Sequence, residues 1–449
     1  MEAIFGADMA DELGKLFIDI GWMLIGITAI FALYVGISAA CYFGWSLATG
    51  RRKGGDFTSL KTVTFGDESA VSANRIASVC GVFALLLLWG VATGSKLLPP
   101  ILPGPFEGTS SFQYTAQNAA GETDTGTVQI YVHKKGDKPE DPALPDAAND
   151  GFAKNDVFTV QVRRSSVLRA KKNDEGGEQE GYQITHVDGQ PIGAEETVSV
   201  DNATVYLTRK GSLSIAADPG WTMEALYLPP PEQVWSRFLD LHENGYQNVG
   251  LWEGQFWSLI RVVIGFALGC LFGIPLGFAM GLSGWFRGWF DPIVEFMRPV
   301  PPLALIPLII IWFGIWEKGK ISLLFLAALW IMTIAARAGV SGVNISKVHA
   351  AYSLGASKRQ ILTKVILPNS LPEIFTGARV AMGVCWGTVV AAELVAAQKG
   401  AGKMIIAASK FQLTDIVIVG IILIGIIGYG IDILMRMAEK WLIPWKGRG

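Results

Sequence analysis

Seven apolar stretches constrain this chain of 449 residues more than any other feature of its sequence. About 20 helical residues cross a hydrocarbon core of ~30 Å, so the pattern predicts about seven membrane-spanning helices. The stretches lie at residues 16–49, 76–97, 256–282, 300–316, 320–340, 375–397 and 414–436. The stretch at 300–316 is the weakest candidate, because Pro301, Pro302 and Pro307 interrupt it.

Composition supports a membrane protein and excludes several other classes. Hydrophobic residues make up 51% of the chain and charged residues only 17%, a balance that soluble proteins of this length rarely reach. The formal net charge of −2 gives no indication of a nucleic-acid partner. All four cysteines lie in apolar stretches without metal-ligand spacing, so we interpret them as small core residues: Cys41, Cys80, Cys270 and Cys385.

Basic residues predict the orientation in the membrane. Three clusters fall between the first and second spans, between the fifth and sixth, and after the seventh, and they include Arg51, Arg52, Lys53, Lys358, Arg359, Arg436 and Lys440. The positive-inside rule places all three in the cytoplasm, with the N-terminus outside and the C-terminus inside. Lys399, Lys403 and Lys410 then fall outside, against the rule.

Residues 104–226 differ completely from the rest of the chain. They are polar and show period-2 alternation, first in Phe112, Tyr114 and Ala116 and then in Val128, Ile130 and Val132. Turn signals such as Asp188-Gly189 separate about seven short strands. We therefore expect a small β-sandwich on the outer side of the membrane, crossed by a Pro-rich linker at 134–150.

A polar segment between the fifth and sixth spans has helical composition around a glycine. It runs from about 345 to 368, with small residues at Ala350 and Ala351 and a predicted sharp turn at Gly355. Pro368 is expected to end the second of two short helices. Such a segment, facing the cytoplasm, is suited to docking a partner, although an ordinary amphipathic loop helix has the same composition.

This segment resembles the "EAA" signature of ABC importer permeases, in which a coupling helix sits in a cleft of the ATPase subunit. His349 stands where that family usually has Glu. The resemblance implies ATPase coupling through seven residues: His349, Ala350, Ala351, Leu354, Gly355, Leu367 and Pro368.

The resemblance extends over Leu226–Gly447, to the taurine, sulfonate and nitrate branch of these permeases. It is carried by stretches such as Tyr227-Leu-Pro-Pro-Pro-Glu, Asp291-Pro-Ile-Val-Glu-Phe-Met-Arg-Pro and Val390-Ala-Ala-Glu-Leu-Val. It implies an all-α polytopic fold with a type I ABC importer permease core, in the bacterial inner membrane. The implied function is inward transport of taurine or a related small alkanesulfonate by ATP-driven alternating access. The implied partners are an ATPase dimer that binds ATP and Mg²⁺, a periplasmic solute-binding protein, a second copy of this chain and membrane lipid.

The sequence thus divides into five parts. Residues 1–50 form an extra N-terminal span that the family core lacks, and 51–75 form a cytoplasmic loop. The first core span is at 76–103, the periplasmic insert at 104–226, and the remaining core with its coupling helix at 227–449. The insert resembles bacterial cadherin-like or Ig-like repeats with the final hairpin first, as if circularly permuted, and acidic residues of the kind that bind calcium are sparse in it.

No catalytic chemistry is visible in the sequence. It contains no G-x-x-x-x-G-K-[ST] phosphate loop, no HExxH motif and no Cys/His cluster, so we expect neither an enzyme nor a cofactor or metal in this chain. Trp386, Thr388 and Glu393, in the sixth span, are candidates for the solute path, and helix packing is the alternative for Glu393.

Three other functions are compatible with parts of the sequence. One is transport of nitrate or another small organic anion by the same mechanism. The second is an ion-driven secondary transporter, which predicts inverted repeats and buried acid–base pairs near the midplane, and the sequence pattern shows neither. The third is a cell-surface adhesion protein that acts through the sandwich, which does not explain the coupling-helix signature.

Overall fold

The computed structural model describes residues 7–49, 75–134, 136–137, 151–177 and 181–445. They belong to two compact units, Met1–Glu224 and Ala225–Gly449, which are treated separately below. Most of the predicted cytoplasmic loop at 51–75 and most of the predicted linker at 134–150 lie outside the described residues.

The first unit begins with two helices, α1 (Ala7–Thr49) and α3 (Arg75–Thr93). At 1.5 Å per residue the 43 residues of α1 extend about 65 Å, well beyond a ~30 Å hydrocarbon core, and its candidate span is Ile20–Thr49. The two helices pack against each other. Gly81 allows this approach, because a Cβ there would lie 2.7 Å from the Tyr34 hydroxyl oxygen.

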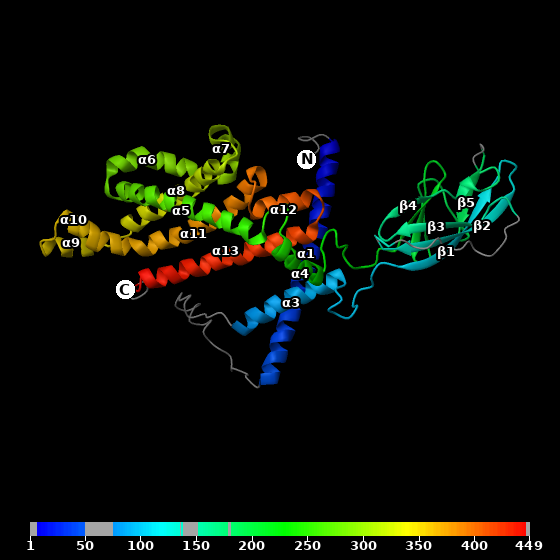
Figure 1. Ribbon diagram of the computed structural model, residues 1–449, viewed down its shortest axis with the longest axis horizontal. Helices are drawn as coiled ribbons and strands as arrows, with labels where there is room; N and C mark the ends of the chain where they lie inside the picture. The colour runs from blue at the N-terminus through cyan, green and yellow to red at the C-terminus, as the bar shows by residue number, and fades with distance from the viewer. Residues whose placement is uncertain (1–6, 50–74, 135, 138–150, 178–180, 446–449) are drawn as a thin grey trace. The chain divides into compact units, whose positions relative to one another are not determined.

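Two sheets form the sandwich that follows α3 (Figure 1). One has the order β3-β2-β1-β5-β6, and the other β4-β9-β8-β7. The pairs are antiparallel except β2 with β3, which are parallel. The strands are β1 (Gly108–Gln117), β2 (Thr123–His133), β3 (Asp156–Gln161), β4 (Ser165–Leu168), β5 (Gln183–Val187), β6 (Gln190–Pro191), β7 (Thr197–Val200), β8 (Ala203–Leu207) and β9 (Leu213–Ala217).

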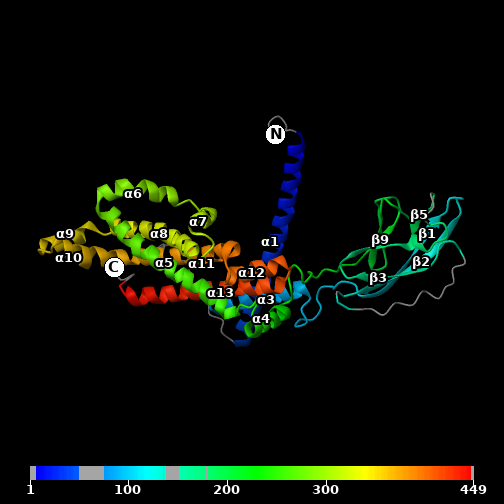
Figure 2. The same cartoon turned by 45° about the horizontal axis from the view of Figure 1, so that its top comes forward.

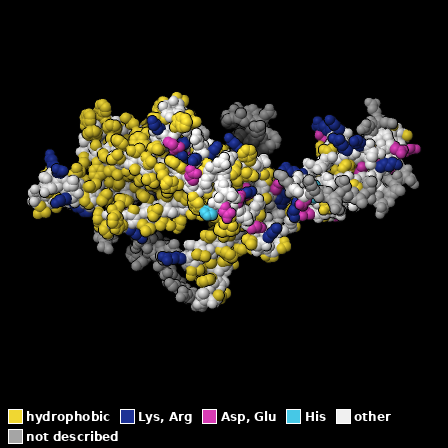
Figure 3. All heavy atoms as spheres, viewed as in Figure 1, with side chains coloured by type: hydrophobic (Ala, Val, Ile, Leu, Met, Phe, Trp, Pro, Cys, Tyr) yellow, Lys and Arg dark blue, Asp and Glu magenta, His cyan; other side chains and the backbone are white. Residues whose placement is uncertain are grey.

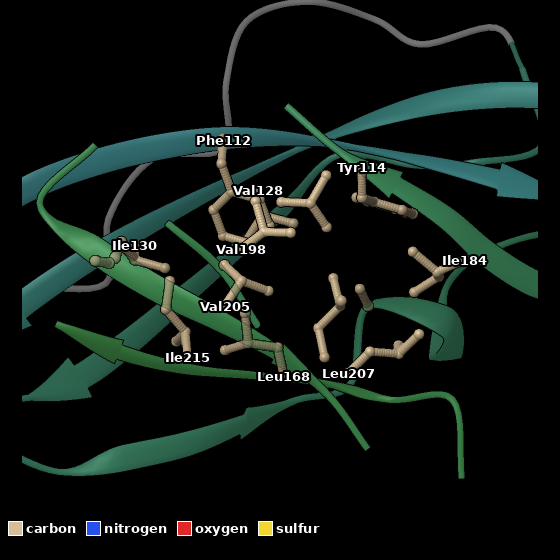
Figure 4. Packing of buried hydrophobic residues seen from close by; sticks show 14 of the residues in the cluster. Phe112, Tyr114, Val128, Ile130, Leu168, Ile184, Val198, Val205, Leu207 and Ile215 are labelled. Carbon is tan, nitrogen blue, oxygen red and sulfur yellow. The ribbon is translucent and has the colours of Figure 1, made fainter. Parts of the chain in front are cut away.

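The predicted alternation of buried and exposed residues is confirmed. Phe112, Tyr114 and Ala116 of β1 are buried, as are alternate residues of β2. Side chains from both sheets meet in one apolar core, where Phe112 and Val128 of one sheet face Val205 and Ile215 of the other (Figure 4). Burial of this apolar surface holds the two sheets together.

A polar network lies at one end of this core. The Asp174 carboxylate accepts hydrogen bonds from the hydroxyls of Tyr114 (2.9 Å) and Tyr182, and from the Lys154 backbone N–H (2.7 Å). Asp156 is buried nearby, and its Oδ2 has no hydrogen-bond donor among the described residues. Burial, together with the negative charge of Asp174, raises the pKa of Asp156 to about 7.

The segments that enter and leave the sandwich are hydrogen-bonded to each other. Phe106 N–H donates to the Asp218 carbonyl (3.0 Å), and Trp221 N–H donates to the Pro103 carbonyl (2.9 Å). Met223 N–H donates to the Ala92 carbonyl in the last turn of α3 (2.8 Å). The Arg163 guanidinium also donates to the Thr222 hydroxyl (2.8 Å). These bonds tie both connections to the end of α3.

Every named element of the second unit, within its described residues, is a helix (Figures 1 and 2). The short helix α9 and the segment around α12 lie at opposite ends of it in both views. Its elements are α4 (Pro231–Asn244), α5 (Leu251–Leu282), α6 (Gly284–Met297), η3 (Pro302–Leu305), α7 (Ile306–Phe313), α8 (Glu317–Ser341), α9 (Ile345–Ser353), α10 (Lys358–Ile361), η4 (Leu362–Ile366), α11 (Leu367–Ala396), α12 (Ala401–Lys410) and α13 (Thr414–Leu442).

Glycines bring α5 and α8 into close contact. Gly265, Gly269, Gly273 and Gly277 recur every fourth residue along α5 and face α8. A Cβ at Gly269 would lie 2.3 Å from the Cβ of Ala328. Small residues at this spacing let helix backbones approach closely in a membrane, where packing rather than water exclusion drives association.

The prediction of a span at 300–316 was wrong in detail. Six helices are long and apolar enough to cross a membrane among the residues described, or seven if α6 and Pro302–Phe313 are counted as one span bent by 93°. After the bend the chain forms the short 3-10 helix η3 and then α7, whose eight residues are too few to cross a membrane alone. Pro301 and Pro302 lack backbone N–H donors and so break the helix where a straight span would have continued.

We predict that the sandwich loses stability as the pH rises from about 4 to about 7. The folded-state pKa of Asp156 is raised above its unfolded value of about 3.9, so the folded state binds more protons within this window. The slope for one such group reaches about 1.4 kcal/mol per pH unit. The free energy of unfolding of the sandwich at each pH is measured by urea-dependent labelling of Val205→Cys, in a chain whose four native cysteines have been replaced. Asp156→Asn should abolish the slope, and an unchanged slope in that variant contradicts the prediction.

Candidate functional site

The predicted coupling segment forms two short helices with a turn between them. α9 starts at Asn344, whose side-chain oxygen accepts from the Ser346 N–H (2.9 Å). None of its residues is buried. Leu354, just after α9, is 88% exposed, and Tyr352 and Ile345 are also exposed. The helix is therefore held by its cap and leaves apolar side chains uncovered within the described chain.

Gly355 makes the turn that the sequence predicts. Its φ is +79°, and open space surrounds the position that a Cβ would occupy. The Ala356 N–H reaches back to the Ala351 carbonyl (3.0 Å), which closes the end of α9. Ser357 then caps α10 in a capping box with Gln360. A glycine is favoured here because most side chains with a Cβ disfavour positive φ.

The expectation that Pro368 ends the second short helix was wrong. The chain stays helical from α10 through a π-helical turn, Leu362–Ile366, into α11, where Pro368 occupies the first turn. In the wide turn the Leu367 N–H bonds to the Leu362 carbonyl, five residues back. The added residue per turn changes which carbonyl faces the proline ring, and this accommodates Pro368 without a break.

The coupling segment itself carries only positive charge. Between residues 342 and 372 the sequence has four basic side chains and no Asp or Glu: Lys347, Lys358, Arg359 and Lys364. All four side chains are exposed. His349 is exposed as well. The segment therefore offers a partner both exposed apolar side chains and exposed basic ones.

The three candidates for the solute path are all buried within this chain. Trp386 donates its indole N–H to the Ile424 carbonyl (3.1 Å), and Thr388 is 4% exposed. Glu393 has no exposed surface. Their part in a solute path stays a prediction, but their contacts within the chain are well defined.

Glu393 is the centre of a buried charge cluster. Its carboxylate accepts from Arg261 Nη1 (2.6 Å), from the Ser258 hydroxyl (2.8 Å) and from the Gly402 backbone N–H (3.1 Å). These donors come from α5 and from the start of α12. Gly402 and the preceding Gly400 allow α12 to start against the carboxylate, since a Cβ at Gly400 would lie 2.3 Å from it.

Arg261 links this carboxylate to a third helix. It is 2% exposed, and its guanidinium donates to both oxygens of Glu317 at the start of α8 (2.5 and 2.9 Å). Lys320, also buried, bonds to Glu317 (2.8 Å). Sequence reasoning singled out Glu393 but missed Arg261. The available signal was that Arg261 is the only charged residue between Glu253 and Arg287.

Comparison with known proteins defines the class. Residues 271–444 match the family of binding-protein-dependent transport system inner membrane components. The chain is 45% identical to the taurine transport system permease protein TauC of Escherichia coli (strain K12) over 258 residues, which cover 57% of this chain and 92% of TauC.

Two further relatives carry related names. A putative aliphatic sulfonates transport permease protein, SsuC of E. coli (strain K12), is 38% identical over 52% of this chain and 86% of its own length. The nitrate import permease protein NrtB of Synechocystis sp. is 31% identical over 49% of this chain and 82% of its own length.

The chain therefore belongs to the ABC importer permeases, in the taurine, sulfonate and nitrate branch. It is a multi-pass inner-membrane permease subunit rather than an enzyme, and the ATPase activity of such importers lies in a separate subunit.

We predict that breaking the Arg261–Glu393 pair from one side destabilises the permease more than removing both charges. Arg261→Met leaves the Glu393 carboxylate buried without its cation, a change that typically costs about 3–5 kcal/mol. The double variant Arg261→Met/Glu393→Met should recover part of the loss. Thermal unfolding of the purified chain in detergent measures both.

Arg298→Met, which removes an exposed partner of Glu295, serves as the control and should change stability by less than about 1 kcal/mol. Equal stability of Arg261→Met and this control would contradict a structural role for the buried pair.

Proposed function

We propose that this chain is the transmembrane subunit of an importer for taurine or a related short alkanesulfonate. The observation that carries the proposal is the 45% identity to TauC over 92% of that protein. The 38% identity to SsuC supports sulfonates as a class. In the assembly we propose, two copies of the chain pair with two ATPase subunits, and a solute-binding protein delivers the cargo.

The contacts of α9 support a role in energy coupling. α9 and α10 form an exposed end of the bundle whose own packing leaves Tyr352 and Leu354 uncovered. α11 runs from this end for 30 residues, or about 45 Å of continuous helix, and carries Glu393 in its last turn. Closure of the ATPase subunits around α9 would displace α10, and α11 would move with it because the chain is helical from α10 into α11. The solute path at the opposite end of the bundle would then open or close toward that side of the membrane, which is alternating access.

The proposed orientation puts the coupling end and the C-terminus in the cytoplasm. Four basic residues without an acidic neighbour mark the coupling segment, as the positive-inside rule requires. Lys399, one of the three lysines that oppose the rule, is paired with Glu253 (2.6 Å), which reduces the conflict. In this orientation the N-terminus and the sandwich face the periplasm.

Substrate identity can be tested with the reconstituted importer and its binding protein. We expect taurine to stimulate ATP hydrolysis most and longer alkanesulfonates to stimulate it less, with nitrate inactive. Empty binding protein is the control. Stimulation by nitrate but not by taurine would contradict the proposed substrate while leaving the permease assignment intact.

Coupling can be tested at Gly355. We predict that Gly355→Val lowers ATP-dependent uptake at least about tenfold, because a β-branched residue resists a φ of +79° and shifts α9 against α10. Gly355→Asn, which tolerates this conformation, should retain most of the uptake. Both are measured in vesicles holding equal amounts of inserted protein.

The same vesicles report ATP hydrolysis, which separates loss of coupling from loss of assembly. Uncoupled hydrolysis in Gly355→Val supports the assignment of the segment. Normal uptake by this variant would show that the turn plays no part in coupling.

A further inference from the structure

A cleft opens between the two sheets at one end of the sandwich. Its volume is about 550 Å³, within the range of about 300–1,000 Å³ typical of small-molecule sites. One wall comes from β5 and the residues around β6, and the other from the turn between β8 and β9. Ile184, Ile192 and Leu207 lie at the base of the cleft, where the buried core of the sandwich begins, and polar side chains line the rest of it.

Three cations line the cleft: Lys171, Arg209 and Lys210. No Asp or Glu is among the described lining residues. Arg209 is paired with Glu195 (2.5 Å), whereas Lys171 and Lys210 have no ion-pair partner within the described part of the chain. Figure 3 shows Lys and Arg side chains gathered at one end of the sandwich. Among the described lining residues, the cleft therefore carries a surplus of positive charge above the edge of the core.

Lys171 is held in place rather than extended into solvent. Its ammonium lies 5.4 Å from the centre of the Tyr182 ring, and Tyr182 is itself fixed by its hydroxyl bond to Asp174. Gly211 lets the β8–β9 turn approach, since a Cβ there would lie 2.6 Å from Lys171 Nζ. Partial burial lowers the pKa of Lys171, and the negative charge of Asp174 opposes this effect.

We propose that this cleft binds an organic anion with an apolar body, whose sulfonate or carboxylate group meets Lys171 and Lys210. The apolar body would lie against Ile184, Ile192 and Leu207. A two-carbon sulfonate such as taurine would leave most of the ~550 Å³ unfilled, so the cleft favours a larger anion than the proposed cargo. The site belongs to the sandwich alone and does not depend on which solute the membrane helices carry.

The test uses the full chain in lipid nanodiscs and equilibrium dialysis with naphthalene-2-sulfonate. We expect saturable binding of about one molecule per chain, and at least tenfold weaker binding by Lys171→Met/Lys210→Met. Ethanesulfonate, which lacks the apolar body, and naphthalene-2-sulfonamide, which lacks the charge, should each bind at least tenfold more weakly. Empty nanodiscs correct for partition into lipid.

Two further variants separate the cleft from general surface charge. Lys172→Met removes an exposed charge from the same short helix but does not line the cleft, so it should bind like the unmodified chain. Ala194→Trp fills the cleft and keeps every charge, so it should lose binding. Hydrogen exchange in the strands verifies that each variant is folded.

Three results would each overturn the proposal. They are the absence of saturable binding up to about 1 mM, an equal loss in Lys172→Met and in the double variant, and full binding by Ala194→Trp.

Discussion

The ion pair between Arg261 and Glu393 fixes the geometry of one end of the helix bundle. Both groups are buried in a chain that crosses the membrane, where an unpaired charge is expensive. The pair sets the position of α5 against α11, and its remaining hydrogen bonds bring in α8 through Glu317 and the start of α12 through Gly402. Four helices thus share one set of contacts, and none can move at this end without breaking at least one.

The opposite end of the bundle is organised differently. There α9 and α10 are held by a helix cap, a capping box and the turn at Gly355, and they leave apolar and basic side chains exposed. The glycine contacts between α5 and α8 run along the length between the two ends. A force applied at the exposed end would therefore pass through closely packed helices to the locked end. The bundle is closely packed at the Arg261–Glu393 end, and it exposes side chains at the α9–α10 end, where a partner is expected.

Much of this architecture could be predicted from patterns that act locally. Period-2 alternation predicted the strands around Phe112 and Val128, because the sequence itself determines which face of a strand is buried. Gly355 predicted a turn because its conformation depends on its own missing Cβ. Apolar length predicted most of the spans.

What the sequence could not supply depended on partners distant along the chain. Arg261 gained its role only when the fold brought Glu393, 132 residues away, within hydrogen-bond distance. The sequence around Pro368 predicts a helix end. The π-helical turn before Pro368 lets the helix continue instead, and no local sequence pattern predicts that turn. The cleft in the sandwich likewise joins residues of β5 and of the β8–β9 turn, which no spacing rule connects.

The hydrogen bonds between Phe106 and Asp218, and between Pro103 and Trp221, have a consequence for how such a chain can change. The segment that enters the sandwich from α3 and the segment that leaves the sandwich lie side by side and are hydrogen-bonded to each other. The sandwich of more than 100 residues therefore leaves and rejoins the end of α3 at one place, as a hairpin loop would. Domains whose two ends lie close together are tolerated as insertions, because the host chain has to bridge only a short gap. The paired connections therefore make the end of α3 a junction at which a domain can be inserted or exchanged.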